Sequence, residues 1–387
     1  MLNDALFKIV QNKQLSILNN KNVGVKTMSE WSKKPILFDD DRITRPYIGG
    51  KLLNEWRRME PAEDNHNCEE LLVTSIGAIS KGHGEGYAIS KTVPSQGSIS
   101  LKTIIASDPN GILGEKYNKK NPNNLSVLAR AGDTIVRLVL QCHPKEDDAK
   151  KYFNSICGKT EAWYIARTRK VEGEENCVYA GFKKHVTREL WKRLFEEQNI
   201  PEMVNCLHKI PVKEGDVVLI PAGMVHAVGP GCIFLEVHEC NDITIRVERN
   251  INGMVLTDEE MFNGLSADEG IGLFDFETYT FEEIKEKVIM KEKDVIVQNG
   301  SKSANMIDYS DTKAFGMQLV DIDGEFTLPD FDGHRIMVAI GGDVKLKWGN
   351  ESIELIQGHG ALIPAECDDL KLIASGARVM IGLPAKL

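Results

Sequence analysis

The stretch Gly215-Asp-Val-Val-Leu-Ile-Pro-Ala222 recurs near the end of the chain as Gly358-His-Gly-Ala-Leu-Ile-Pro-Ala365. Glycine and proline stand at identical spacing in the two copies, and both copies carry short apolar runs. A short apolar run bounded by turn residues is typical of a buried strand, and a recurring segment indicates a repeated structural unit. We therefore predict a mainly β fold with two related β-barrel units.

The two copies differ in the residue that follows them. His226 comes five residues after the proline of the first copy, whereas Asp369 holds that position after the second, in a run with no imidazole nearby. The first unit is therefore predicted to carry a metal ligand that the second lacks. The C-terminal unit is predicted to be a packing or lid module.

The length of 387 residues suits two or three domains. We predict a helical or poorly ordered lead-in over residues 1–30, a catalytic metal-binding unit over residues 31–280 and a C-terminal unit over residues 281–387. Residues 35–107 show short apolar runs between Gly-, Pro- and Asp-containing turns, a pattern that indicates strands.

Helices are predicted to be inserted around residues 187–207 and 257–290. Apolar residues recur at helical spacing among charged neighbours after Thr187. Two capping boxes, Thr257-Asp-Glu-Glu260 and Thr280-Phe-Glu-Glu283, mark further helix starts.

The composition is that of a globular protein outside membranes. Hydrophobic residues make up 42% of the chain and charged residues 27%, and the formal net charge is −10. An acidic chain without a basic patch argues against nucleic acid as a partner, although a small anionic substrate can still bind to a few convergent cations. No apolar run reaches the length of a membrane span, and the first residues do not read as a secretory signal. Eight scattered cysteines without a CxxC pair indicate reduced thiols and a cytoplasmic location.

The segment Arg137-Leu-Val-Leu-Gln-Cys-His143 alternates as a strand does. Successive side chains of a strand point to opposite faces, so Gln141 and His143, two residues apart, are predicted to point into the same space. Two ligands of one ion need this arrangement.

Two further segments carry the other candidate ligands. In Lys159-Thr-Glu-Ala-Trp163, Lys159 and Glu161 are predicted to share a strand face. In Ile220-Pro-Ala-Gly-Met-Val-His226, a strand runs into a Pro/Gly turn that places an imidazole at a strand end.

Gln141, His143, Glu161 and His226 together form a mixed nitrogen and oxygen set. Such a set suits Zn²⁺ or a similar divalent ion with an open position for substrate or water. A single histidine on a strand is more often a hydrogen-bonded or surface residue, so the combination carries the metal hypothesis.

The segment Asp242-Ile-Thr-Ile-Arg-Val-Glu248 also alternates. It has two interpretations: an amphipathic strand with a solvated polar face, or a strand whose Asp242 and Arg246 face the metal. On a regular strand these two residues are about 13 Å apart and would contact different parts of a ligand.

The chain resembles the class I mannose-6-phosphate isomerase (phosphomannose isomerase) family of the bacterial type. Order and spacing agree between about residues 125 and 250, and the family's two-cupin layout extends the match more loosely from about residue 35 to the end. The motifs that carry the resemblance are Gln141-Cys-His-Pro144, Gly158-Lys-Thr-Glu-Ala-Trp-Tyr164, Gly215-Asp-Val-Val-Leu-Ile-Pro-Ala-Gly-Met-Val-His-Ala227, and Glu236-Val-His-Glu-Cys-Asn-Asp242 followed by Arg246.

The resemblance implies two cupin-like (jelly-roll) barrels and one Zn²⁺ per chain, with other divalent ions possible. It implies that Lys159, Asp242 and Arg246 act in catalysis or contact the substrate. The implied reaction interconverts mannose 6-phosphate and fructose 6-phosphate through a zinc-stabilised cis-enediol, with a small sugar phosphate as partner and no nucleic acid or membrane. The resemblance assigns no phosphate-binding residue and no oligomeric state.

The chain departs from the family pattern at three places. The stretch Asn67-Cys-Glu-Glu-Leu-Leu72 has no tryptophan where relatives usually show one. Leu128-Ala-Arg-Ala-Gly-Asp133 stands where the family has a Lys-x-x-Asp-Ala segment, and Thr244-Ile-Arg-Val-Glu-Arg249 lacks the family's usual tyrosine before the arginine. None of these departures touches the predicted metal ligands.

Three other hypotheses remain open on the sequence. The same chemistry could act on another sugar or sugar phosphate, or the site could belong to a sugar-binding cupin without turnover. An iron-dependent cupin oxygenase is the third, although such enzymes more often present a His-x-His pair than a glutamine in the first ligand position.

Overall fold

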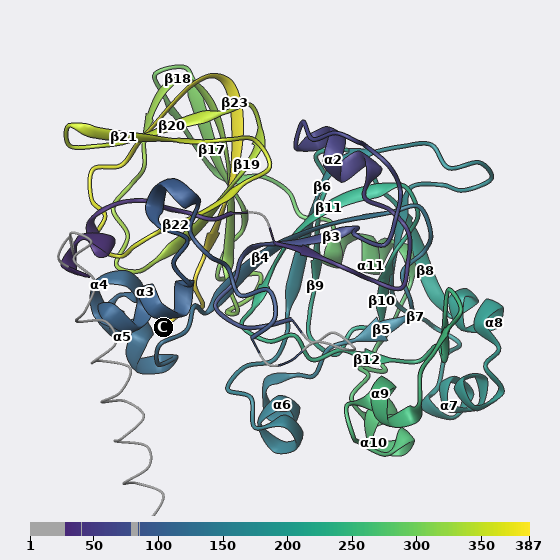
Figure 1. The fold of residues 1–387 in the computed structure, drawn as a ribbon. Coiled ribbons are helices and arrows are strands. Elements are labelled where there is room, and N and C mark those ends of the chain that lie inside the picture. The colour runs from purple at the N-terminus through teal and green to yellow at the C-terminus, as the bar shows by residue number, and fades with distance from the viewer. Residues whose placement is uncertain (1–27, 40, 79–83, 85) are drawn as a thin grey trace, which may run out of the picture.

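The computed structural model describes residues 28–39, 41–78, 84 and 86–387, which form a mainly β structure (Figure 1). The predicted fold class is confirmed at this level. Most of the predicted lead-in lies outside the described residues, and the described chain begins with the 3-10 helix η1 (Met28–Lys33).

Two six-stranded sheets build the first half of the chain. The first sheet has the order β2 (Arg42–Ile43), β3 (Glu69–Val73), β4 (Val127–Thr134), β11 (Cys232–Glu239), β6 (Glu161–Thr168) and β9 (Val217–Ile220). The second has the order β12 (Ile245–Arg246), β5 (Gln141–Cys142), β10 (His226–Val228), β7 (Cys177–Lys183) and β15 (Thr278–Tyr279), with β8 (Leu207–Pro211) also paired to β7.

The two sheets face each other across an interior that holds both apolar and charged side chains. Trp163 and Val218 of the first sheet pack with Val178 and Ile210 of the second. Because side chains alternate along a strand, Glu161 points into the same interior as Trp163. The candidate site lies there.

A nine-stranded third sheet forms the second half. Its strands are β1 (Ile36–Leu37), β22 (Gly360–Ile363), β19 (Arg335–Gly341), β23 (Lys371–Leu383), β18 (Gly316–Thr327), β17 (Ser301–Ile307) and β16 (Lys293–Gln298), with β20 (Val344–Trp348) and β21 (Glu351–Leu355) attached through β23. The recurring segment is a strand in both places, β9 and β22, and each strand ends just before its proline.

The third sheet packs against the face of the first sheet that points away from the site. Ala162 and Leu219 of the first sheet share one apolar core with Met306, Met317 and Met380 of the third. The alternation of β6 thus places Ala162 in this core and Glu161 in the site.

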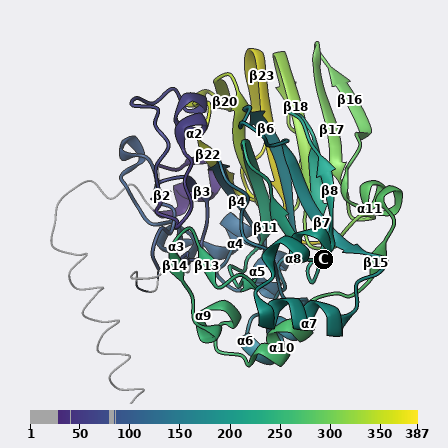
Figure 2. The ribbon, with the colours of Figure 1, turned by 90° about the vertical axis from the view of Figure 1, so that its right-hand side faces the viewer.

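The predicted helical insertions are confirmed. They contain α7 (Arg188–Glu197), α8 (Ile200–Asn205), α9 (Asp258–Phe262), α10 (Ala267–Gly272) and α11 (Phe281–Val288). Both predicted capping boxes form, and a third at Ser266 and Glu269 was not predicted. Figures 1 and 2 show α7, α9 and α10 gathered at the end of the first half that is remote from β16–β23. The small hairpin β13 (Asn250–Ile251) and β14 (Met254–Val255) precedes α9.

The prediction of strands throughout residues 35–107 is wrong in part, because this region also contains helices. They are α2 (Lys51–Trp56), the 3-10 helix η2 (Pro94–Gln96) and α3 (Leu101–Ser107), followed outside the region by α4 (Pro109–Leu113), α5 (Glu115–Lys120) and α6 (Glu146–Phe153). Asp133 Oδ2 accepts hydrogen bonds from the N–H groups of Gly50 and Leu52 at the start of α2, at 2.8 and 2.9 Å. A cap so distant along the chain leaves no local sequence signal. No helix among the described residues is long and apolar enough to cross a membrane.

Candidate metal centre

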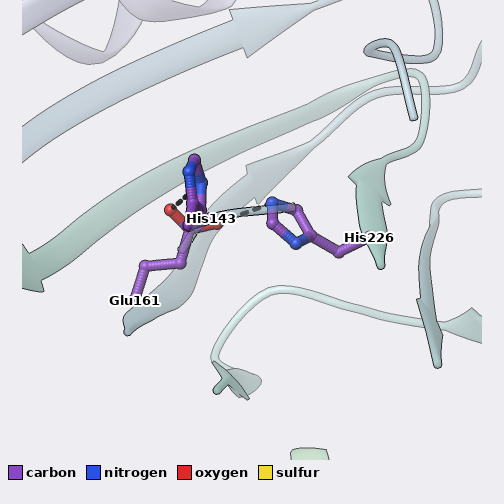
Figure 3. A group of neighbouring side chains, drawn as sticks. All are labelled: His143, Glu161 and His226. Carbon is purple, nitrogen blue, oxygen red and sulfur yellow. Dashed lines mark ion pairs between the residues drawn. The ribbon is translucent and has the colours of Figure 1, made fainter. Parts of the chain in front are cut away.

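Two imidazoles and one carboxylate converge in the interior between the first two sheets (Figure 3). Nε2 of His143 lies 3.1 Å from one oxygen of Glu161, and Nε2 of His226 lies 3.1 Å from the other. All three side chains are only 1% exposed. One ligand atom from each residue lies within 4.8 Å of the others, so a single ion could bind all three.

Strand ends position these side chains. Glu161 is the first residue of β6, His226 is the first of β10, and His143 follows directly after β5. Gln141 is the register partner of His226, with 3.3 Å between its amide nitrogen and Nε2 of that ring. The structure thus brings together all four predicted metal ligands.

The predicted strand over residues 137–143 is wrong in length, because only Gln141 and Cys142 are in a strand. Before Gln141, the side chain of Glu248 makes the hydrogen bonds that a neighbouring strand would otherwise make. It accepts hydrogen bonds from Leu140 N at 2.6 Å and from both terminal nitrogens of Arg137.

Both imidazole rings are held in the orientation that metal binding needs. Nδ1 of His143 donates to the carbonyl of Ile243 at 2.8 Å, and Nδ1 of His226 donates to that of Met224 at 2.9 Å. A neutral ring that donates through Nδ1 presents Nε2 as an acceptor, the usual arrangement for a metal-binding histidine.

The Nε2 atoms therefore face carboxylate oxygens that are also acceptors. Such a contact is favourable only when a cation is shared between the two groups. For His143 and Glu161 the Lys159 ammonium, which donates to both, is one such cation, whereas the contact between His226 and Glu161 has no lysine donor to the ring among the described residues. Burial, followed by the nearby charge of Lys159, lowers the pKa of His143 to about 4, so this ring does not carry the proton near pH 7. The donor set of Glu161 and the two rings therefore fits a divalent metal ion.

Lys159 lies inside the same interior and is fully buried. Its Nζ lies 2.7 Å from Glu161 and 3.3 Å from Glu236, and it donates to Nε2 of His143 at 3.0 Å. Burial alone would raise the pKa of the Glu161 carboxyl, but the charge of Lys159 and the two imidazoles hold that pKa well below its usual range. Glu161 is therefore a carboxylate, as a metal ligand must be.

Sequence reasoning missed three buried titratable residues that extend this cluster. Glu236 pairs with Arg130 at 2.9 Å as well as with Lys159, and His238 Nε2 lies 3.9 Å from the same carboxylate. Burial, with the charge of Lys159 as the next cause, lowers the pKa of His238 to about 4. The available signal was the alternation of Glu236 and His238 after the apolar first half of the strand β11.

The predicted catalytic residues Asp242 and Arg246 lie at the less buried side of this cluster. Asp242 is 3.6 Å from Arg130, and Arg246 is the register partner of Gln141. The predicted regular strand over residues 242–248 is wrong, since β12 contains only two residues.

Arg130 belongs to the segment that departs from the family pattern. Arg130 and Asp133 are three residues apart, the spacing of the lysine and aspartate in the Lys-x-x-Asp-Ala pattern. Arg130 thus stands in the position of the lysine of that pattern, and Thr134 stands in the position of its alanine.

Fold and site together define a class: a mainly β protein with a buried, mixed nitrogen and oxygen centre of the kind that binds a catalytic divalent metal. No protein-family model matches the chain. Sequence relatives are the protein named "Probable mannose-6-phosphate isomerase GmuF" of Bacillus subtilis, 26% identical over 217 residues (55% of this chain and 60% of the relative), and the mannose-6-phosphate isomerase ManA of the same organism, 31% identical over 131 residues (34% and 39%). The matched stretches thus span less than two thirds of either relative.

The fold comparison covers almost the whole chain. The crystal structure of the Bacillus subtilis mannose 6-phosphate isomerase has a TM-score of 0.70 and 17% identity over 90% of this chain and 99% of its own. A variant of the Salmonella typhimurium phosphomannose isomerase has a TM-score of 0.68 and 14% identity over 91% and 100%. The resemblance to the class I mannose-6-phosphate isomerase family is thus confirmed.

Proposed function

We propose that the protein is an aldose–ketose isomerase that interconverts mannose 6-phosphate and fructose 6-phosphate. The observation that carries the proposal is the convergence of His143, Glu161 and His226, with both Nε2 atoms directed at the carboxylate. The names of the sequence relatives support the choice of substrate.

In this proposal one Zn²⁺ is held by Gln141, His143, Glu161 and His226. A divalent ion, when bound, supplies Lewis acidity toward the oxygens at C1 and C2 of the sugar. The hydrogen bond from the His143 ring to the Ile243 carbonyl would fix this ligand before the metal binds, and the strand pairing of Gln141 with His226 would fix Gln141.

The chain's own groups would move the protons. Isomerisation removes the proton from C2 of the aldose and returns a proton to C1, while a proton passes from O2 to O1, through a cis-enediol. Asp242 is the proposed base, because its carboxylate lies at the part of the cluster that water reaches, with 14% of the side chain exposed. Lys159 would place positive charge beside the developing negative charge on oxygen.

We also propose that the two halves are cupin-like units with residues 31–280 catalytic and residues 281–387 supporting. Among the described residues, the only group of three or more His, Cys, Asp or Glu with metal spacing is His143, Glu161 and His226, all in the first half. The strand β1 nevertheless pairs with β22, so a segment of the first unit completes the sheet of the second.

The test is isomerisation of mannose 6-phosphate by purified protein, followed as fructose 6-phosphate formation, with glucose 6-phosphate and unphosphorylated mannose as alternative substrates. We expect turnover of mannose 6-phosphate in preference to the others, and its loss in His226→Ala. If the protein turns over only one of the other sugars, that sugar is the substrate instead of mannose 6-phosphate. Bound metal without turnover of any of these sugars would favour a binding protein, and oxygen consumption with bound iron would favour the oxygenase.

A further inference from the structure

Three arginines, Arg45, Arg130 and Arg246, gather at the less buried side of the charged cluster. The side chains of Arg45 and Arg130 are 12% and 11% exposed, whereas Glu161 and Lys159 are at most 1% exposed. Arg246 is partly buried beside Gln141. The cluster therefore has a deep end at the metal ligands and a shallow end that is rich in guanidinium groups.

Strand pairing brings these arginines together from distant parts of the chain. Arg45 follows β2 and its Nε donates to Glu69 at 2.6 Å. Glu69 pairs in register with Gly132, so Arg130, two residues earlier on β4, is its diagonal neighbour. Arg130 in turn contacts Asp242 at 3.6 Å, four residues before Arg246.

Arg45 and Arg246 each keep hydrogen-bond donors that no other described residue uses. Within the described part of the chain, the Arg45 side chain donates only through Nε, and that of Arg246 only through Nη1 to the Thr244 carbonyl at 3.5 Å. By contrast, both terminal nitrogens of Arg137 bind the Glu248 carboxylate.

The two unused guanidinium groups also repel each other. Both are cations at the same partly buried end of the cluster. An anion placed between these groups would relieve the repulsion and accept their free N–H groups.

We propose that Arg45, together with Arg130 and Arg246, forms the binding site for the phosphate group of a phosphorylated sugar. The choice of a sugar phosphate rests on the proposed function, whereas the anion site follows from the arginines themselves. The sugar would extend from this shallow end toward Glu161. Arg45 is then the residue that distinguishes phosphorylated from unphosphorylated sugars.

The experiment measures binding of inorganic phosphate to the zinc-loaded protein by calorimetry, in the wild type and in Arg45→Gln. The glutamine amide can still donate to Glu69, so the ion pair becomes a hydrogen bond. We expect phosphate affinity to fall about tenfold or more, because at least one charge-assisted hydrogen bond is lost. Arg58→Gln is the matched control, since Arg58 is 53% exposed and pairs with Asp343, and its affinity should stay within twofold of the wild type.

Glu69→Gln separates an anion site from a folding defect. Removing the carboxylate that competes for Arg45 should tighten phosphate binding, whereas Arg45→Gln should weaken it. Unchanged affinity in Arg45→Gln, or equal weakening in both variants, would overturn the anion site. If phosphate binding depends on Arg45 but the wild type isomerises no sugar phosphate, the anion site stands and the proposed function fails.

Discussion

Glu161 is the residue on which the candidate metal centre depends. Each of its carboxylate oxygens faces one imidazole nitrogen at 3.1 Å, and Lys159 neutralises it at 2.7 Å. An isolated carboxylate at this depth would take up a proton, and a protonated carboxyl cannot serve as an anionic ligand. Lys159 thus keeps the ligand ionised in addition to any contact with substrate.

Replacing Lys159 with methionine should impair both stability and activity. The change leaves Glu161 and Glu236 buried without their shared cation, so the free energy of unfolding should fall by about 3 kcal/mol. Turnover should fall about 100-fold. Urea unfolding and the isomerisation assay measure the two effects.

The matched control is Lys145→Met, because Lys145 pairs with Asp275 at the surface, where the lysine side chain is 51% exposed. It should change stability by less than about 0.5 kcal/mol. Wild-type turnover in Lys159→Met would contradict the role of this residue.

The buried residue His334 should make the folded protein less stable in acid. Burial lowers its pKa to about 4, although the hydrogen bond to the Leu113 carbonyl opposes the shift. In the unfolded chain this histidine takes up a proton near pH 6.5, whereas in the folded chain it stays neutral until the pH approaches 4. The free energy of unfolding therefore has its full value above pH 6.5 and decreases as the pH falls toward 4. His334→Gln should therefore lose about 2 kcal/mol less than the wild type between pH 7 and pH 5. Urea unfolding at both pH values measures this, and equal losses would show that His334 does not titrate as described.

At the scale of elements, local pattern predicted what local interactions decide. The capping boxes at Thr257 and Thr280 involve residues three apart, and their helices form as predicted. The helix α2 escaped prediction because its cap, Asp133, comes from a distant strand.

The same reasoning explains which site residues the sequence could indicate. Gln141 and His143 are neighbours on one segment, as are Lys159 and Glu161, so alternation alone relates the members of each pair. The partnership of Arg130 with Glu236 requires β4 and β11 to be adjacent in the sheet. Strand order is a tertiary property that one sequence does not reveal.

Thr280→Ala should destabilise the protein by about 1 kcal/mol, because the Glu283 N–H at the start of α11 loses its acceptor. Thr280→Ser keeps the hydroxyl and should be nearly neutral. Urea unfolding compares the two variants. Equal stability of the two would mean that α11 is held by the packing of Ile284 and Val288 alone.

At the scale of the whole molecule, the two halves are joined by more than the chain that connects them. β1 belongs to the third sheet, and Trp56 of α2 donates through Nε1 to the Ile340 carbonyl at 2.6 Å. The third sheet also supports the strand β6 that begins with Glu161, through the core that contains Ala162. The recurring segment predicted two units but gave no sign of this exchange between them.

The most direct test of the proposed metal-dependent reaction is a zinc titration of metal-free protein, with isomerisation of mannose 6-phosphate as the readout. We expect no activity without metal, a linear rise as zinc is added, and a plateau at one zinc per chain. Activity that persists in chelator, or none at saturating zinc, would contradict the proposal that one metal ion on Gln141, His143, Glu161 and His226 drives the reaction.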